Sequence, residues 1–149
     1  MPTTRRIVWR GRTLRILALG FAGFGLAYVA RAPEMAGLTG IVLPTRTASI
    51  DFAATYGGAQ LGLAIFLAFC ARERSRYRLG LLAGGWTLIG IGGVRLVELV
   101  LPGGAVAPVM YAGLAIELAA AALAFLMAGK ARPAHPDSPP ASERSLLRP

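Results

Sequence analysis

The stretch from Leu79 to Leu101 reads LGLLAGGWTLIGIGGVRLVELVL, and its length and apolar character decide the fold. A helix rises ~1.5 Å per residue, so about 20 apolar residues cross the core of a bilayer. Arg95 and Glu98 interrupt this stretch, and a central arginine costs on the order of 3 kcal/mol in a membrane helix. Arg95 therefore requires a polar partner, and we treat it as a candidate functional residue.

Three other apolar stretches have similar lengths: Leu14 to Ala30, Phe52 to Ala71 and about Ala105 to Ala128. The 149-residue chain is 55% hydrophobic and 15% charged, whereas soluble domains carry about a quarter charged residues. We predict an all-α fold, a four-transmembrane-helix up-down bundle over residues 14–128. It follows a basic N-terminal segment, 1–13, and precedes a tail, 129–149, predicted to be disordered because it is rich in Pro and Ser.

The basic residues predict the orientation of the bundle. They form three groups: Arg5, Arg6, Arg10, Arg12 and Arg15; Arg72, Arg74, Arg76 and Arg78; and Lys130, Arg132, Arg144 and Arg148. The other two loops hold only Arg31 and Arg46. The positive-inside rule therefore places both termini in the cytoplasm. The high arginine content, with abundant Ala and Gly, is typical of a bacterial chain, and we predict a multi-pass protein of the bacterial inner (plasma) membrane.

The net charge of +9 does not indicate nucleic-acid binding, because few aromatic residues accompany the arginines. The lipid bilayer, with its anionic headgroups, is the predicted partner.

The N-terminus has two interpretations. Thr4 to Arg10 loosely resembles a twin-arginine export signal, and Ala30-Arg31-Ala32 resembles a cleavage site. We favour a retained first helix, because three later membrane segments exclude an exported soluble product.

The loop from Arg31 to Ile50 is the longest connection. Met35, Leu38 and Val42 recur at helical spacing and predict a short interfacial helix bounded by Pro33 and Pro44. This helix is either a connector, which we favour, or a lid over the outer helix ends. Pro102-Gly103-Gly104 predicts a tight turn.

Motifs for enzymatic chemistry are scarce. Cys70 is the only cysteine and His135, in the tail, is the only histidine, so the sequence predicts no disulfide, metal site, cofactor or catalytic triad, and no enzyme. Glycines inside the apolar stretches predict close helix packing: Gly20, Gly23, Gly25, Gly58, Gly62, Gly80, Gly84 and Gly85.

Polar residues in the apolar stretches form the candidate site. Counted at ~1.5 Å per residue, Tyr56, Gln60, Arg95 and Glu117 all lie in the outer to middle bilayer, while Glu98 is shallower. Asp51 should lie at the interface.

Helical spacing gives two polar or small-residue faces that should turn inward: Gly84, Leu88, Gly92, Arg95 and Glu98 on the third stretch, and Gly113, Glu117, Ala120, Ala121 and Ala124 on the fourth. We predict an ion pair between Arg95 and Glu117, with hydrogen bonds from Tyr56 and Gln60. One carboxylate is then left over.

Two functional hypotheses follow. In the first, the cluster is a structural clasp in a non-enzymatic protein that acts alone, as a homo-oligomer or as an accessory subunit of a membrane-protein partner. In the second, it lines an outer cavity that binds a small ligand, a lipid headgroup, a quinone-like molecule or a proton. A small proton-linked transporter is a further alternative, although the first helix lacks the acidic residue expected of small multidrug transporters.

The segment Ala54-Thr55-Tyr56-Gly57-Gly58-Ala59-Gln60-Leu61-Gly62-Leu63 resembles the signature of domain of unknown function family 4345, the small four-helix bacterial membrane proteins. Arg95 and the Glu117-Leu118 step are also similar to that family, over about residues 14–128. The resemblance implies architecture and location and no defined activity. A more distant similarity to DoxX-like proteins implies, by analogy, a redox or quinone-linked role.

Overall fold

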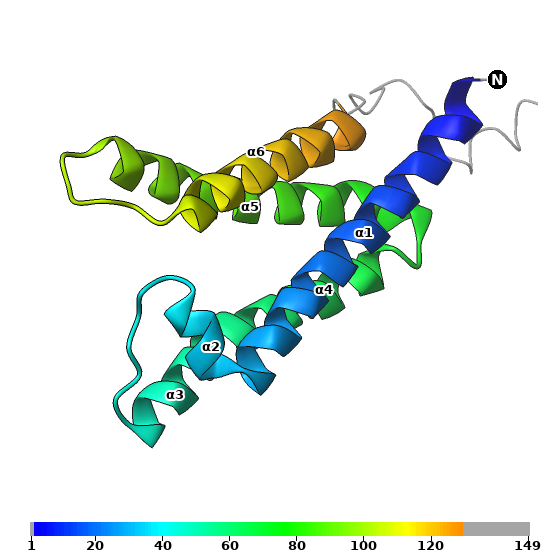
Figure 1. Ribbon diagram of the computed structural model, residues 1–149. Helices are drawn as coiled ribbons and strands as arrows, with labels where there is room; N and C mark the ends of the chain where they lie inside the picture. Colours follow the sequence, from blue (N-terminus) through cyan, green and yellow to red (C-terminus); the bar gives the residue numbers. More distant parts are fainter. Residues whose placement is uncertain (1, 130–149) are drawn as a thin grey trace, which may run out of the picture.

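The computed structural model of the protein describes residues 2–129, which form helices and no strand. The long helices are α1 (Pro2–Ala30), α4 (Ala59–Cys70), α5 (Tyr77–Val100) and α6 (Pro108–Ala128) (Figure 1). Four segments are long and apolar enough to cross a membrane: Ile7–Ala30, Arg46–Cys70, Arg74–Val100 and Pro108–Ala128. These findings confirm the all-α prediction with four potential spans. The predicted disordered tail lies, from Lys130 onward, outside the described residues.

Helix α1 continues without a break through the basic segment that precedes Leu14. Arginine is a good helix former, so the charged residues do not end the helix. Arg10 of this extension donates to the last carbonyls of α6, with Nε 2.6 Å from Met127 O and a terminal guanidinium nitrogen 2.9 Å from Ala128 O. A cation at a helix C-terminus satisfies carbonyls that have no partner inside the helix. Arg10 thus ties the start of α1 to the end of α6.

The loop between the first two spans differs from its prediction. Helix α2 (Ala32–Gly37) contains Pro33 in its first turn, where proline fits because no intrahelical N–H bond is lost. The helix ends at Gly37, so Leu38 and Val42 lie beyond it and are exposed. The loop thus contains a short helix, as predicted, but the predicted bounds are wrong, because the helix begins at Ala32 and ends well before Pro44.

The second span is built from three consecutive helical segments. Helix α3 (Arg46–Phe52) begins after Thr45, whose side chain accepts a hydrogen bond of 3.1 Å from the Ala48 N–H. A π-helix, η1 (Ala53–Gly58), then connects α3 to α4. Because a π turn contains more residues than an α turn, Phe52 and Gly57, five residues apart, are both buried.

The π-helix determines which glycine of the second span packs against α1. A Cβ added at Gly57 would lie 2.6 Å from Val29 Cγ2 on α1, whereas Gly58 and Gly62 have no neighbour within 4 Å of an added Cβ. Their predicted packing role is therefore wrong, as it is for Gly20 and Gly23. For Gly58 the prediction failed because it assumed regular α-helical spacing, whereas this glycine lies in the π-helix. Gly25, Gly80 and Gly85 do make close contacts, as predicted.

The spans associate as two antiparallel pairs. In the first pair, Gly25 of α1 lies against Leu61 of α4; in the second, Gly85 and Gly92 of α5 lie against Phe125 and Glu117 of α6. The two pairs meet where the first half of α1, the end of α4 and the start of α5 come together, and diverge beyond this junction (Figure 1). Leu14, Leu67, Cys70 and Leu81 are fully buried there.

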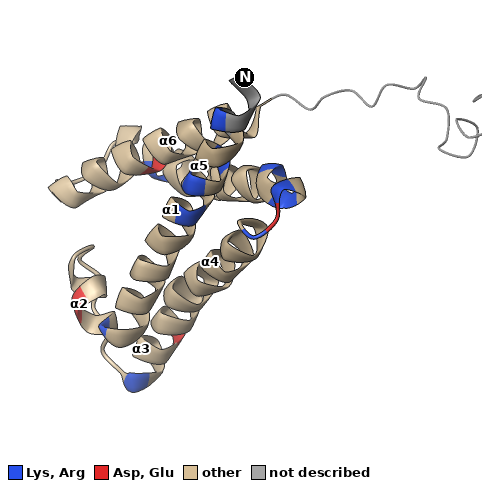
Figure 2. Ribbon diagram, turned by 90° about the vertical axis from the view of Figure 1, so that its right-hand side faces the viewer, with Lys and Arg blue, Asp and Glu red and all other residues tan. Residues whose placement is uncertain are grey.

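Arginines gather at the junction of the two pairs (Figure 2). The short 3-10 helix η2 (Arg74–Arg76) lies at this end, between α4 and α5. The opposite end holds Arg31 and Arg46, which flank α2 and the start of α3. The molecule therefore has one strongly basic end.

Candidate functional site

The candidate site is an ion pair between the two helices of the second pair. Arg95 projects from α5 and Glu117 from α6. Arg95 Nε lies 3.0 Å from Glu117 Oε2, and a terminal guanidinium nitrogen lies 2.9 Å from Glu117 Oε1. This two-bond geometry is the strongest arrangement open to an arginine and a carboxylate. The predicted Arg95–Glu117 pair is present.

Two glycines make room for the pair. A Cβ added at Gly92 would lie 3.3 Å from Glu117 Cβ and 3.4 Å from its Oε2, so the glutamate rests directly on the α5 backbone. A Cβ added at Gly113 would lie 3.6 Å from the central guanidinium carbon of Arg95. Each charged side chain therefore crosses to a glycine of the opposite helix.

The predicted inward faces of α5 and α6 are largely correct. Gly84, Leu88 and Gly92 are buried and Arg95 is half-buried, while Glu98 at the end of the same face is exposed. On α6, Ala121 and Ala124 are buried, and Gly113, Glu117 and Ala120 are half-buried.

Met110 is a member of the site that the sequence did not reveal. Its Sδ accepts a contact of 2.9 Å from the second terminal nitrogen of Arg95. Met110 lies seven residues before Glu117, two turns along one face of α6, so helical spacing could have identified it. A thioether is a soft, weak acceptor that covers the guanidinium without adding charge.

Tyr56 and Gln60 do not take their predicted positions. Within residues 2–129 neither side chain hydrogen-bonds to the ion pair, and this part of the prediction is wrong. The second span packs along α1, and its π-helix turns Tyr56 toward Tyr28 and Phe52. The ring centroids of Tyr56 lie 5.8 Å from Tyr28 and 4.7 Å from Phe52.

Tyr28 provides a link between the aromatic cluster and the ion pair. This cluster consists of Tyr28, Phe52 and Tyr56. Phe52 belongs to a small buried core with Ala32 and Ala36, and Tyr28 packs against that core. Tyr28 interacts electrostatically with both Arg95 and Glu117, so its phenol lies within range of their charges without a direct hydrogen bond. The sequence analysis missed Tyr28 because it considered polar residues of the second, third and fourth apolar stretches but none of the first.

The other two acidic residues of the predicted site, Glu98 and Asp51, lie outside the ion pair. Glu98, in the last turn of α5, is exposed and has neither an ion pair nor a hydrogen bond within the described part of the chain. Asp51, in α3, is also exposed. Glu98 is thus the carboxylate left over, and it lies outside the cluster rather than within it.

The charges and hydrogen-bonding groups of the site satisfy one another. The pair carries no net charge, and its side chains are only 27% exposed for Arg95 and 14% for Glu117. Among the described residues, every buried side-chain nitrogen and oxygen has a hydrogen-bond partner. Chemically, the site can hold two helices in register and can offer the exposed edge of a guanidinium to a neighbouring polar group.

Comparisons with protein-family models, curated proteins and solved structures found no match to this chain. The resemblance to family 4345 therefore stays a prediction, and the functional argument rests on the geometry alone.

Proposed function

We propose that the protein is a non-enzymatic, multi-pass membrane protein in which the Arg95–Glu117 pair clasps α5 to α6, and that it serves as a structural or accessory subunit. The two-bond geometry of the pair carries this proposal. A guanidinium whose donors already meet a carboxylate and a thioether has little capacity left for catalysis.

The proposed orientation follows the charges. The arginine-rich junction faces the cytoplasm of a bacterial cell, and the ends with Arg31 and Arg46 face outward across the inner membrane. Helix α1 is retained in this proposal, because Leu14, Leu17 and Phe21 belong to the main core.

The accessory role is supported by how little of α6 its own chain covers. Only 11% of the α6 span is buried, compared with 33% of the span that contains α5. Its exposed residues include Ala112, Ala115 and Ala119 at helical spacing, and small residues allow membrane helices to approach closely. Lipid or another membrane helix must cover this surface.

A double-mutant cycle on the unfolding free energy in detergent tests the clasp. Arg95→Ala and Glu117→Ala each leave one unpaired charge in an apolar setting, and we expect a coupling of about 1–3 kcal/mol between them. Arg31 and Glu34 form a matched control, because they are an exposed pair at 3.4 Å whose coupling should stay below about 0.5 kcal/mol. Additive effects at Arg95 and Glu117 would disprove the clasp.

Two further measurements complete the test. The variant Arg95→Met with Glu117→Leu removes both charges, and it should be more stable than either alanine variant if pairing is the main role.

Native mass spectrometry of the gently solubilised chain tests the accessory role: a species with one copy and no bound protein would argue against it.

A second candidate function, small-ligand binding, rests on the exposed edge of the Arg95 guanidinium. A polar headgroup or quinone oxygen would accept a hydrogen bond at this edge. Chromatography of lipid extracted from the purified protein distinguishes the functions, because only ligand binding predicts a stoichiometric molecule that Arg95→Ala loses.

A further inference from the structure

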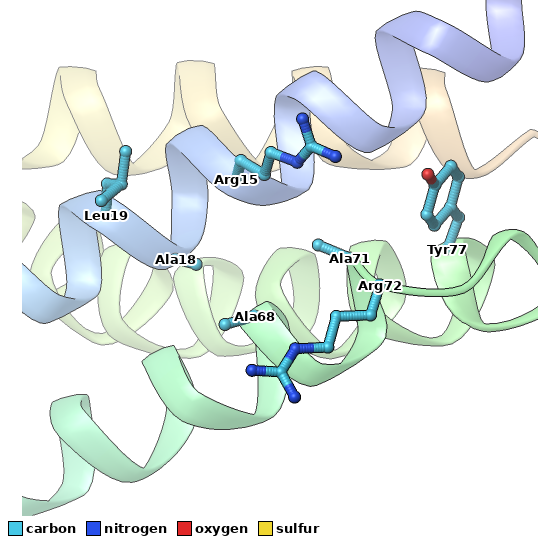
Figure 3. A pocket seen from close by; sticks show the side chains of 7 residues that line it. All are labelled: Arg15, Ala18, Leu19, Ala68, Ala71, Arg72 and Tyr77. Carbon is cyan, nitrogen blue, oxygen red and sulfur yellow. The ribbon is translucent and has the colours of Figure 1, made fainter.

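The basic end of the molecule contains a groove that the clasp does not involve. Its volume is about 410 Å³, and it is open along the surface of the molecule. Helix α1, the end of α4, the turn that follows it and the first residue of α5 line the groove (Figure 3). The lining residues are Arg15, Ala18, Leu19, Ala68, Ala71, Arg72 and Tyr77.

Small side chains create the hollow. Ala18, Ala68 and Ala71 form its floor where α1 and α4 lie side by side (Figure 3). Tyr77 stands at one end, held against α1 so closely that a Cβ added at Gly11 would lie 2.8 Å from its hydroxyl oxygen. The shape of the groove therefore follows from helix packing: its floor is apolar, and the Tyr77 phenol is held in place at one end.

Two arginines flank this floor from opposite sides. In Figure 3, Arg15 lies on the α1 side of the alanines and Arg72 on the other side. Both are exposed, and within residues 2–129 neither has a carboxylate partner. Glu73, next to Arg72, pairs instead with Arg76 at 2.9 Å.

These features define the chemistry of an occupant. Two cations on either side of the groove can each contact one anionic group, and the apolar surface beside them can contact hydrocarbon. A phospholipid with two phosphate groups and several acyl chains has this combination, and basic pockets between membrane helices bind such headgroups. We propose that the groove binds a diphosphatidylglycerol lipid, cardiolipin, with one phosphate at Arg15, the other at Arg72, and acyl chains along Leu19 and Ala68.

Lipid binding by the purified full-length chain, measured by native mass spectrometry in detergent, tests the proposal. The probes are cardiolipin, phosphatidylglycerol with its single phosphate, and phosphatidylcholine without net charge. We expect cardiolipin to bind at least about tenfold more tightly than phosphatidylglycerol, because only cardiolipin reaches both arginines. Equal binding of the two anionic lipids would overturn the proposal.

A charge-matched pair of double variants locates the site. Arg15→Gln with Arg72→Gln should lose about tenfold or more in cardiolipin affinity. Arg5→Gln with Arg74→Gln removes the same charge from exposed arginines that do not line the groove, and should stay within about twofold of the wild type. An equal loss in both double variants would show general attraction to anionic lipid and refute the site.

A third variant tests the floor without changing any charge. Ala68 is exposed on α4, so Ala68→Leu should fill the groove and leave the fold intact. Cardiolipin affinity should fall while the unfolding temperature stays the same. Unchanged affinity in Ala68→Leu, or displacement of cardiolipin by millimolar inorganic phosphate, would each contradict binding of the lipid in this groove.

Discussion

Arg95 keeps its charge inside an apolar helix pair because the neighbouring helix supplies a carboxylate and a glycine at matching heights. Glu117 lies on Gly92, and the Arg95 guanidinium lies on Gly113. Both charges are neutralised at short range, where the low dielectric strengthens their attraction. The energetic cost of burying the arginine is thus offset by the carboxylate of the neighbouring helix.

Gly92 and Gly113 differ in how much space an added Cβ would have, so substitution by alanine should affect them differently. At Gly92 an added Cβ meets Glu117 and Leu118 at 3.3–3.4 Å, whereas at Gly113 the nearest Arg95 atoms are 3.6–3.8 Å away. Gly113→Ala should therefore be neutral or slightly stabilising, because alanine favours helices by about 0.5–1 kcal/mol. Gly92→Ala should be about 1–2 kcal/mol less stable than Gly113→Ala, because the ion pair must shift. Thermal unfolding in detergent measures this, and equal stability of the two variants would contradict the proposed backbone contact.

The ion pair could be predicted from the sequence because regular helices carry it. Residues on α5 and α6 follow α-helical spacing, so the faces with Arg95 and Glu117 were visible as stripes of small residues. Tyr56 and Gln60 could not be placed in this way. Whether the second span packs on α1 or on α5 depends on long-range contacts, such as Gly57 against Val29, that spacing does not specify.

At the scale of elements, the π-helix η1 is the least predictable feature. It adds a residue to one turn and so moves the packing glycine from the predicted Gly58 to Gly57. Its residues, AATYGG, carry no periodic signal that separates a π turn from an α turn. The π turn therefore changes which face of the span Tyr56 and Gly57 occupy, compared with a regular α-helix.

Removing one residue from η1 should convert it to a regular α-helix. Deletion of Thr55, an exposed residue, would place Phe52 and Gly57 four apart, still on one face. We expect this variant to fold, with a loss of stability of about 1 kcal/mol or less. Deletion of the exposed Ile65 is the matched control, because it rotates Leu67 and Cys70 away from the core and should cost about 2–5 kcal/mol. Size-exclusion profiles and unfolding temperatures compare the two, and similar losses would refute the role of the π turn.

At the scale of the whole molecule, the two helix pairs share one basic junction and diverge at the other end. Hydropathy predicts the four spans, and the positions of the arginines are read directly from the sequence, because both are local properties of the chain. The divergence of the pairs results from where contacts between them are concentrated. A Cβ added at Gly80 would meet Leu14 and Cys70 at 2.7 Å, so α5 crosses the first pair near its start. Such a crossing point depends on side-chain fit and has no signature in composition.

Cysteines introduced one at a time test the orientation of the molecule. Cys70 is fully buried, so the wild-type chain should resist a membrane-impermeant maleimide and serve as the background. Arg5→Cys and Arg74→Cys lie at the basic end, and Arg46→Cys lies at the opposite end. In intact spheroplasts only Arg46→Cys should be labelled, because the arginine-rich segments resist translocation. After permeabilisation all three should react to a similar extent, which shows that their thiols are accessible. Labelling of Arg5→Cys or Arg74→Cys before permeabilisation would reverse the orientation and would move the lipid groove to the outer leaflet.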